Sequence, residues 1–311
     1  MNQTGKFQRS WLLLKSSLSV IARNKQLLVF PLVTFSLTIA IILFFLAPAV
    51  LRPTGYSYTQ PEHWQAISHS LFTQPEGASG QHGSQVGFTP AAVAYLALLY
   101  FVSMFFATFF NVAFYSEILA ALSGQTVSIG RGLKFASTRW KAILMWTLFA
   151  GLVGLIIKAI EQRLEIVGRL LARFIGLAWS IASVFVIPII VREDQGSNPL
   201  NILKKSAAIL KRTWGEALIG YAGLAFANTL ILIGSMVLLI GALAASIALN
   251  NFWLVAIAGA FWLVTLFAWS YVTSVASQVY KGALYLYAAE GVVAEPYNRE
   301  MLDMAWKFKK S

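Results

Sequence analysis

The side chains able to catalyse a reaction are few in this sequence and poorly placed for it. Two acidic pairs stand out, Glu161 with Glu165 and Glu193 with Asp194, but both lie in polar stretches between long apolar runs. Paired carboxylates act as acid and base in a dry cleft that separates their pKa values, and surface segments offer none. No HExxH, GxSxG, phosphate-binding-loop or GxGxxG pattern appears. We therefore expect a protein that is not an enzyme.

The residues that commonly bind metals are equally sparse. The chain has no cysteine, which excludes disulfides, thiolate metal sites and cysteine nucleophiles. Its three histidines, His63, His69 and His82, all lie in the polar segment after the first apolar run. No second ligand stands at metal-ligand spacing on one helix face. We interpret the histidines as solvated loop residues, and we expect no metal or other cofactor.

Polar side chains inside the apolar runs are the remaining functional candidates, because hydrocarbon makes them costly unless they face other helices or a cavity. Two interpretations stay open. Small and hydroxyl side chains let helices pack closely, or they line a cavity for a lipid or small solute. The residues of this candidate intramembrane polar seam are Asn111, Asn228, Ser270, Thr273, Ser274 and Ser277.

Asn228 carries the most specific expectation of the seam. The Asn250-Asn251 pair indicates a tight turn between the last two apolar runs, which then form an antiparallel pair. Asn228 lies 22 residues before Asn250, and Thr273 lies 22 residues after Asn251. Because both helices rise equally per residue, we predict that Asn228 faces Ser270, Thr273 or Ser274.

Glu117 is a candidate of a different kind. It follows about 26 mostly apolar residues counted from Ala91, which places it near the inner boundary of its run. A coupling acid for proton-driven transport usually lies deeper in the membrane. We therefore expect Glu117 to be an interfacial acid that anchors the helix end.

The elements that position these residues follow from composition. The chain is 58% hydrophobic and 12% charged, about half the charge of soluble domains, and several apolar runs reach the roughly 18 residues that mark a bilayer span. The predicted fold class is all-α, a polytopic membrane bundle in a single membrane domain, residues 1–311. Its six predicted transmembrane helices are residues 27–50, 90–122, 142–157, 174–191, 217–249 and 252–279. Between them we predict an interfacial helix (1–26), an extracytoplasmic loop (51–89), basic cytoplasmic segments (123–141 and 192–216), an outer segment (158–173) and a cytoplasmic tail (280–311).

The distribution of cations predicts the orientation. Of the 24 Lys and Arg residues, 19 lie in segments that become cytoplasmic when the N-terminus is placed inside, and 5 lie outside. Cytoplasmic loops of membrane proteins carry such an excess. The bias predicts a multi-pass protein with both termini in the cytoplasm.

The cations of the inner segments cluster in amphipathic stretches. Residues 6–25 place Trp11, Leu14 and Ile21 on one face, which either lies in the membrane interface or packs on the protein's own inner face. Basic segments beside a membrane contact anionic lipids, so we expect lipid partners and no nucleic acid. The predicted headgroup contacts are Arg131, Lys134, Arg139, Lys204, Lys205, Lys211 and Arg212. Each basic stretch precedes two spans, which predicts three helical hairpins; whether they form a true threefold repeat stays open.

Three stretches also carry a resemblance. They are Arg9-Ser10-Trp11 with Leu27-Leu28-Val29-Phe30-Pro31, Gly151-Leu152-Val153-Gly154 followed by Glu161-Gln162-Arg163, and Lys211-Arg212-Thr213-Trp214-Gly215-Glu216-Ala217. These stretches resemble an uncharacterised bacterial family of multi-pass membrane proteins, a domain of unknown function, over nearly the whole chain except residues 52–89. The resemblance implies a six-span protein of the bacterial inner membrane, with no known activity, cofactor or catalytic residue. More remotely, the layout is similar to the membrane domain of bacterial glycerophosphodiester phosphodiesterases, but this chain has no soluble domain for their active site.

Two functions fit these features. The polar seam favours transport or handling of a lipid or small solute, and we prefer this hypothesis. The basic segments favour the alternative, a non-catalytic membrane scaffold that acts through partner proteins or anionic lipids. A homo-oligomer and an unknown protein partner are both left open.

Overall fold

The computed structural model describes residues 6–73, 87–163, 166–193 and 198–303. For residues 6–10, 49, 166–167, 169, 212–231, 300 and 303 it describes the helix but not the side chains. Helices dominate the described residues. The elements in chain order are α1 (Lys6–Arg23), a 3-10 turn η1 (Lys25–Leu28), α2 (Val29–Val50), α3 (Pro61–Leu71), β1 (Phe72–Thr73), β2 (Gly87–Phe88), α4 (Pro90–Leu122), α5 (Ile129–Thr138), α6 (Trp140–Arg163), α7 (Ile166–Ala182), α8 (Val186–Arg192), α9 (Pro199–Ala248), α10 (Phe252–Tyr285), a π-helical turn η2 (Leu286–Glu290) and α11 (Arg299–Asp303).

Five helical segments are long and apolar enough to cross a membrane, counted over the described residues. They are Lys25–Pro48, Pro90–Leu122, Trp140–Arg163, Leu170–Arg192 and Phe252–Glu290. The sixth predicted span falls on α9, whose described apolar part is the shorter stretch Leu232–Ala248. Large side chains on these helices point outward, such as Phe44 (73% exposed) and Phe261 (74% exposed). Such exposed apolar surface is costly in water and suits a hydrocarbon environment.

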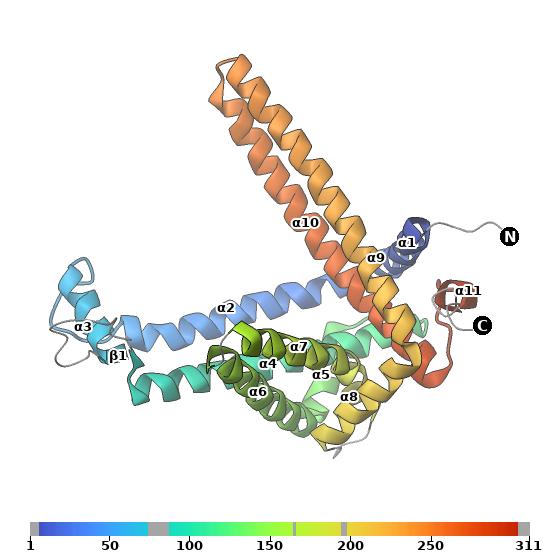
Figure 1. Cartoon of the computed structure of the whole chain (residues 1–311), viewed down its shortest axis with the longest axis horizontal. Coiled ribbons are helices and arrows are strands. Elements are labelled where there is room, and N and C mark those ends of the chain that lie inside the picture. The colour runs from blue at the N-terminus through green and yellow to red at the C-terminus, as the bar shows by residue number, and fades with distance from the viewer. Residues whose placement is uncertain (1–5, 74–86, 164–165, 194–197, 304–311) are drawn as a thin grey trace.

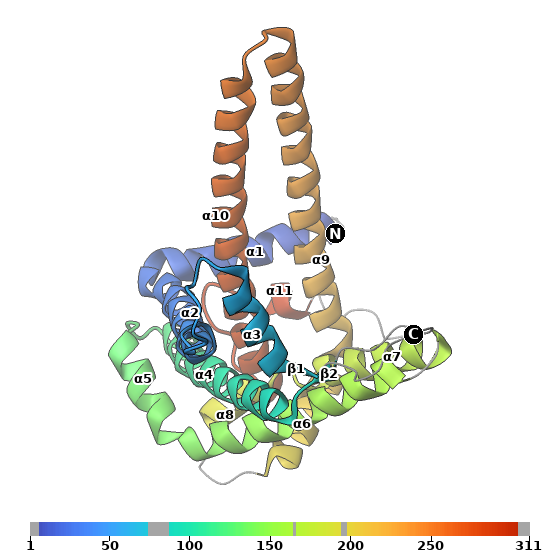
Figure 2. The ribbon, with the colours of Figure 1, turned by 90° about the vertical axis from the view of Figure 1, so that its left-hand side faces the viewer.

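The helices form two arms that diverge from a common packed region (Figure 1). In one arm, α2 lies along α4, and α3 covers the far end. In the other, α9 and α10 run side by side to the turn at Asn250, whose backbone has a positive φ of 46°. α6 packs beside α4, and α7 packs along α6, as the second view also shows (Figure 2). Consecutive long helices therefore pack in pairs.

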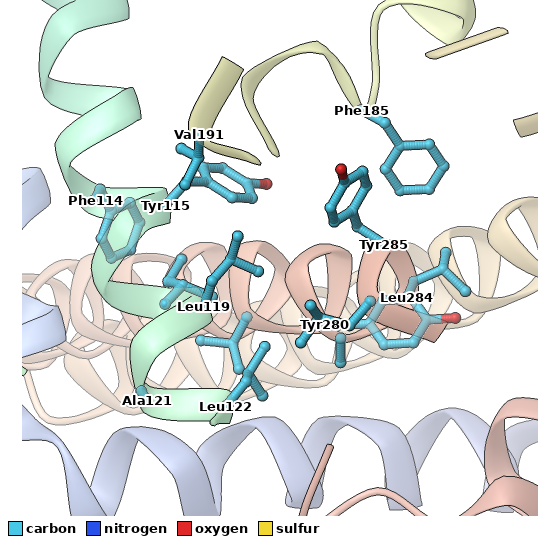
Figure 3. Close-up of a cluster of buried hydrophobic side chains, with 14 of the residues drawn as sticks. Phe114, Tyr115, Leu119, Ala121, Leu122, Phe185, Val191, Tyr280, Leu284 and Tyr285 are labelled. Carbon is cyan, nitrogen blue, oxygen red and sulfur yellow. The ribbon is translucent and has the colours of Figure 1, made fainter. Parts of the chain in front are cut away.

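The core lies where the inner ends of α4 and α10 meet α8; we call these the core ends of the helices (Figure 3). Ile118 of α4 and Leu284 of α10 are both completely buried. Gly282 permits this close approach, because a Cβ atom there would lie only 2.8 Å from Ile118 Cγ2. The buried residues of α4 and α10 begin mainly at Thr108 and Thr273 respectively, so only the core ends pack tightly.

The basic stretch before the fifth predicted span does not form a separate surface helix. The structure continues it into the span as one helix, α9, of 50 residues. Asn198 starts this helix by accepting a hydrogen bond from the Leu200 N–H at 3.0 Å, with Pro199 in the first turn, where its missing N–H costs little. No proline follows before Asn250, and the five glycines in between weaken the helix by about 1 kcal/mol each without removing a backbone hydrogen bond, so the helix continues.

The fourth apolar segment, in contrast, is interrupted. The chain turns between α7 and α8, and the N–H of Phe185 is left without a helical carbonyl to bond. The hydroxyl of Ser206 on α9 accepts that N–H at 3.0 Å, and both residues are completely buried. A buried backbone N–H needs such a partner. The Ser206 hydroxyl therefore offsets the loss of the helical hydrogen bond at Phe185 inside the core.

The first amphipathic helix packs on the protein itself. Leu13, Leu14, Val20 and Ile21 of α1 are buried against α9 and α10, while Trp11 stays 45% exposed. The last described helix, α11, packs on α1. Just before α11, the hydroxyl of Tyr297 lies 2.7 Å from the hydroxyl of Ser17 on α1. The sequence left two positions open for α1, in the membrane interface or against the protein's own inner face. The buried face of α1 packs against the protein.

The expectation that all histidines are solvated is wrong for His63, which is 1% exposed. Its Nε2 lies 3.2 Å from the carbonyl oxygen of Val50, and its Nδ1 lies 2.6 Å from the Thr54 hydroxyl. The last carbonyls of a helix lack partners within the helix, and His63 supplies one to α2. His69 is exposed, and His82 lies outside the described residues.

Candidate functional site

A pocket of about 270 Å³ opens between α2, α4 and α10 beside the core. It is lined by residues of all three helices: Pro31, Thr34, Phe35, Asn111, Phe114, Ser274, Val275 and Gln278. The rings of Phe30 and Phe114 stack behind it with centroids 5.5 Å apart, which fixes α2 against α4. Tyr271 of α10 donates a hydrogen bond to the Leu28 carbonyl and ties α10 to the start of α2. We call this space the α2–α4–α10 pocket.

The polar side chains of this pocket keep unused hydrogen-bonding groups. The phenol of Tyr115 donates to Gln278 Oε1 at 2.6 Å, which orients the amide and leaves the Gln278 Nε2 hydrogens for the pocket. Asn111 and Ser274 are exposed, and within the described part of the chain no protein group hydrogen-bonds their side chains. Thr34 is different, since its hydroxyl donates to the Phe30 carbonyl at 2.9 Å. The pocket thus presents two amides and a hydroxyl.

The structure brings together only part of the predicted seam. Asn111 and Ser274 share the pocket, although they lie on different helices. Thr273 faces the core, where it is buried and its hydroxyl donates to the Trp269 carbonyl at 2.8 Å. Ser277 is half-buried and lines neither this pocket nor the next one. Asn228 lies among the residues whose side chains are not described, so its pairing stays a prediction.

Ser270 lines a second pocket of about 270 Å³ between α9 and α10. Its other walls are mostly apolar and include Leu232, Trp262 and Trp269. The hydroxyl of Ser235, also in this wall, is already satisfied by the Leu232 carbonyl at 2.7 Å. This second pocket offers few free polar groups and is the weaker candidate for recognition.

Glu117 is buried at the core end of α4, with 1% of the residue exposed. Its carboxylate accepts hydrogen bonds from Arg131 Nε at 2.9 Å, Arg131 Nη2 at 2.5 Å and the Ser128 backbone N–H at 2.7 Å. Ser128 is the N-cap of α5, so the carboxylate sits at the positive end of that helix. Glu117 therefore fastens α5 to α4, and it does not line either described pocket.

Two further features make this attachment tight. The hydrogen bond from Arg131 to Glu117 raises the pKa of the guanidinium above its already high ordinary value, so Arg131 stays charged. Gly132, the next residue, lies so close to α4 that a Cβ there would be 2.8 Å from the Ala113 carbonyl oxygen and 2.9 Å from Glu117 Cγ. Only a residue without a side chain fits at this contact.

Three of the predicted headgroup contacts have a partner within the protein. Arg131 is held by Glu117, Lys205 pairs with Glu193, and Arg139 lies over the Phe135 ring at 5.5 Å. Lys134 on α5 and Lys204 and Lys211 on α9 are exposed. The side chain of Arg212 lies outside the described part. The exposed cations therefore come from α5 and from the first turns of α9.

Metal ligands are not grouped in the described part of the chain. No cluster of three or more His, Asp or Glu side chains there could hold a metal ion. The three groups that line the α2–α4–α10 pocket most openly are uncharged, so they are suited to hydrogen bonding and not to acid–base chemistry or metal binding.

Sequence analysis missed Gln278 as part of the site. Its position four residues after Ser274 places both on one face of α10, which is a signal that the sequence does contain. The contribution of α2 through Pro31 and Thr34 has no comparable signal, because Thr34 looks like any hydroxyl residue bonding back along its helix.

Comparison with known proteins gives one match. The model of a family of unknown function, DUF6159, matches residues 90–295, which is more than half of the chain. A search of curated proteins found no match. The matched range contains α4 and α10, two of the three helices around the pocket, and ends before α11. The chain therefore belongs to the family of unknown function DUF6159.

Proposed function

We propose that this protein is a non-catalytic membrane protein that handles a lipid or small solute through the α2–α4–α10 pocket. One observation carries the proposal: Asn111, Ser274 and Gln278 converge on a pocket between apolar helices while keeping hydrogen-bonding groups without protein partners. A free polar group among apolar helices is costly unless something bonds to it. A polar ligand that enters from the membrane or through it would supply that partner.

The proposal includes a membrane arrangement. The chain crosses the bacterial inner membrane six times in three helical hairpins, α2 with α4, α6 with α7–α8, and α9 with α10, with both termini in the cytoplasm. The contacts within each pair and the excess of cations near the core ends support this arrangement. The core ends then face the cytoplasm, and the tips of the two arms face outward.

Native mass spectrometry of gently extracted protein tests the proposal. We expect the wild type to retain a specific lipid or metabolite, and Asn111→Leu to lose it, because leucine fills the site without a hydrogen bond. Ser277→Ala is the matched control, since Ser277 lies on α10 within the same turns but outside the pocket lining. A wild type that retains no small molecule, or a loss shared equally by the control, would contradict the proposal.

The exposed cations of α5 and α9 support a second candidate, a scaffold that binds anionic lipids or partner proteins. Lys134, Lys204 and Lys211 all project from surface turns, and each cation near an anionic leaflet contributes about 1 kcal/mol. In the same experiment a retained protein, without a small molecule, would favour this candidate. Replacing these three lysines by glutamine would then weaken binding to anionic vesicles, whereas the Asn111→Leu variant would not.

A further inference from the structure

The depth of the pocket can be measured from the charged residues of its three helices. On α4, Asn111 lies six residues from Glu117, and on α10, Ser274 lies seven residues from Lys281. Pro31, in the first turn of α2, lies six residues after Lys25, which begins the preceding 3-10 turn η1. At 1.5 Å per residue, each separation is about 10 Å along the helix. Toward the arm tips these helices carry no further charged residue within the bilayer-crossing stretch. On all three helices the pocket therefore lies about 10 Å from the nearest charged residue, on the side of the arm tips.

This depth corresponds to a chemically distinct layer of the bilayer. The headgroup region on each side is about 5–8 Å thick outside a hydrocarbon core of about 30 Å. A site about 10 Å inward from charged residues at the outer limit of the headgroup region lies just inside the hydrocarbon boundary. The glycerol backbone and the ester carbonyls of a lipid lie at this boundary, between the charged headgroup and the acyl chains.

The hydrogen-bonding groups of the pocket that have no protein partner also suit the chemistry of the glycerol–ester layer. The Asn111 and Gln278 amides and the Ser274 hydroxyl are all donors, and ester carbonyls are acceptors that cannot donate. No charged side chain is among the pocket-lining residues, so a phosphate has no counter-charge inside it. Phe35 at the pocket wall is 64% exposed and gives the acyl chains an apolar surface to follow outward.

We infer that the α2–α4–α10 pocket binds a glycerolipid of the inner leaflet through its glycerol–ester region. Asn111, Ser274 and Gln278 donate to the ester carbonyls, the acyl chains pass along Phe35, and the phosphate stays at the level of Lys25. This inference rests on the proposed function and specifies its ligand. On this inference the pocket recognises the ester linkage of the acyl chains and not the headgroup.

The experiment compares two phosphatidylglycerols that share headgroup and chain length and differ only in ester or ether linkage to the chains. Full-length wild-type protein is equilibrated with an equimolar mixture of both lipids in detergent micelles, and the lipid retained is measured by native mass spectrometry. An ether lacks the carbonyl oxygen, so the loss of one or two hydrogen bonds predicts a preference of roughly tenfold for the ester. The wild type alone gives this result, without a variant that could misfold.

Variants then locate the preference. Asn111→Leu and Ser274→Ala should each retain less lipid and a smaller excess of the ester, because each removes one of the donors, whereas Ser277→Ala should keep the wild-type retention and ratio. Equal retention of ester and ether by the wild type would overturn the inference, as would a preference that Ser277→Ala abolishes as well. Retention of a non-lipid solute in place of either lipid would overturn the inference and leave the proposed function standing. A wild type that retains nothing would overturn both.

Discussion

The attachment of α5 to α4 through Glu117 and Arg131 allows a sharp prediction about which partner is harder to lose. The two side chains differ greatly in burial: the Glu117 side chain is 2% exposed and that of Arg131 is 45% exposed. Substituting each by glutamine removes the ion pair in both cases. The charge that remains is buried in Arg131→Gln and half-exposed in Glu117→Gln.

The magnitudes follow from that difference. Arg131→Gln leaves the buried carboxylate with the Ser128 N–H as its remaining donor, and breaking a buried pair in this way costs about 3–5 kcal/mol. Glu117→Gln leaves a guanidinium that water can reach and that still donates to the Thr126 carbonyl at 2.7 Å. The loss of charge-assisted bonds to a partly solvated group costs about 1–2 kcal/mol. We therefore expect Arg131→Gln to be the more damaging substitution by about 2 kcal/mol.

The double variant Glu117→Gln/Arg131→Gln leaves no unpaired charge, so it should be more stable than Arg131→Gln alone. The destabilisation of the double variant is then smaller than the sum of the two single effects, as expected for a buried charge that depends on its partner. The assay uses a single cysteine at Ala136, which is completely buried on α5, in a chain with no native cysteine. Its labelling rate reports detachment of α5, and a 2 kcal/mol difference corresponds to roughly 30-fold in rate.

Hydrogen–deuterium exchange of the α5 amides, in proteins without the added cysteine, checks that Ala136→Cys has not loosened the helix itself. The reasoning is refuted if Glu117→Gln exposes α5 as much as Arg131→Gln does. It is also refuted if the effects of the two single substitutions simply add in the double variant, because the carboxylate would then not depend on its partner.

Three further predictions concern other parts of the chain. Gly132→Ala should loosen α5 by about 1–3 kcal/mol because its Cβ meets the Ala113 carbonyl, whereas Gly130→Ala, which meets nothing within 4 Å, should be neutral or stabilising; thermal unfolding compares them. Burial raises the pKa of the Tyr297 phenol, so its contribution to stability is complete below the unfolded pKa of about 10 and is lost as pH rises further; Tyr297→Phe should lose less thermal stability than the wild type between pH 9 and pH 11. Single cysteines at Ser57 and Ser137 should react with an impermeant maleimide from opposite sides of the membrane, and labelling from one side would refute the proposed topology.

The apolar helices could be predicted from sequence because length and composition alone determine them. Five of the six predicted spans coincide with helices of sufficient length, although the third is longer than predicted, running from Trp140 to Arg163. Its polar end, with Lys158 and Glu161, looks like a loop to a hydropathy count but still has good helix formers. Composition cannot show where such a helix ends when no glycine or proline stops it.

The partner of Glu117 could not be predicted in the same way. Counting residues placed Glu117 near the boundary of its run, but Arg131 lies 14 residues later, beyond a turn that reverses the chain. Which cation meets the carboxylate depends on how α5 is rotated, and Gly132 fixes that rotation by allowing one close approach. The burial of His63 could not be predicted for a related reason. Only the folded chain brings His63 back to the end of α2.

The polar seam shows where helix periodicity stops being informative. Ser270, Thr273 and Ser274 all fall within about 100° around the axis of α10. From the sequence alone they therefore form one polar stripe on the helix. In the fold, α10 has α9 on one side and α2 with α4 on the other, so the three hydroxyls face a second pocket, the core and the α2–α4–α10 pocket respectively. A stripe on one helix becomes a site only where another helix adds a group at the same depth, as Asn111 does for Ser274. Recognition in this chain should therefore depend on pairs of residues from different helices, and substituting Ser270 or Thr273 should leave binding at the α2–α4–α10 pocket unchanged.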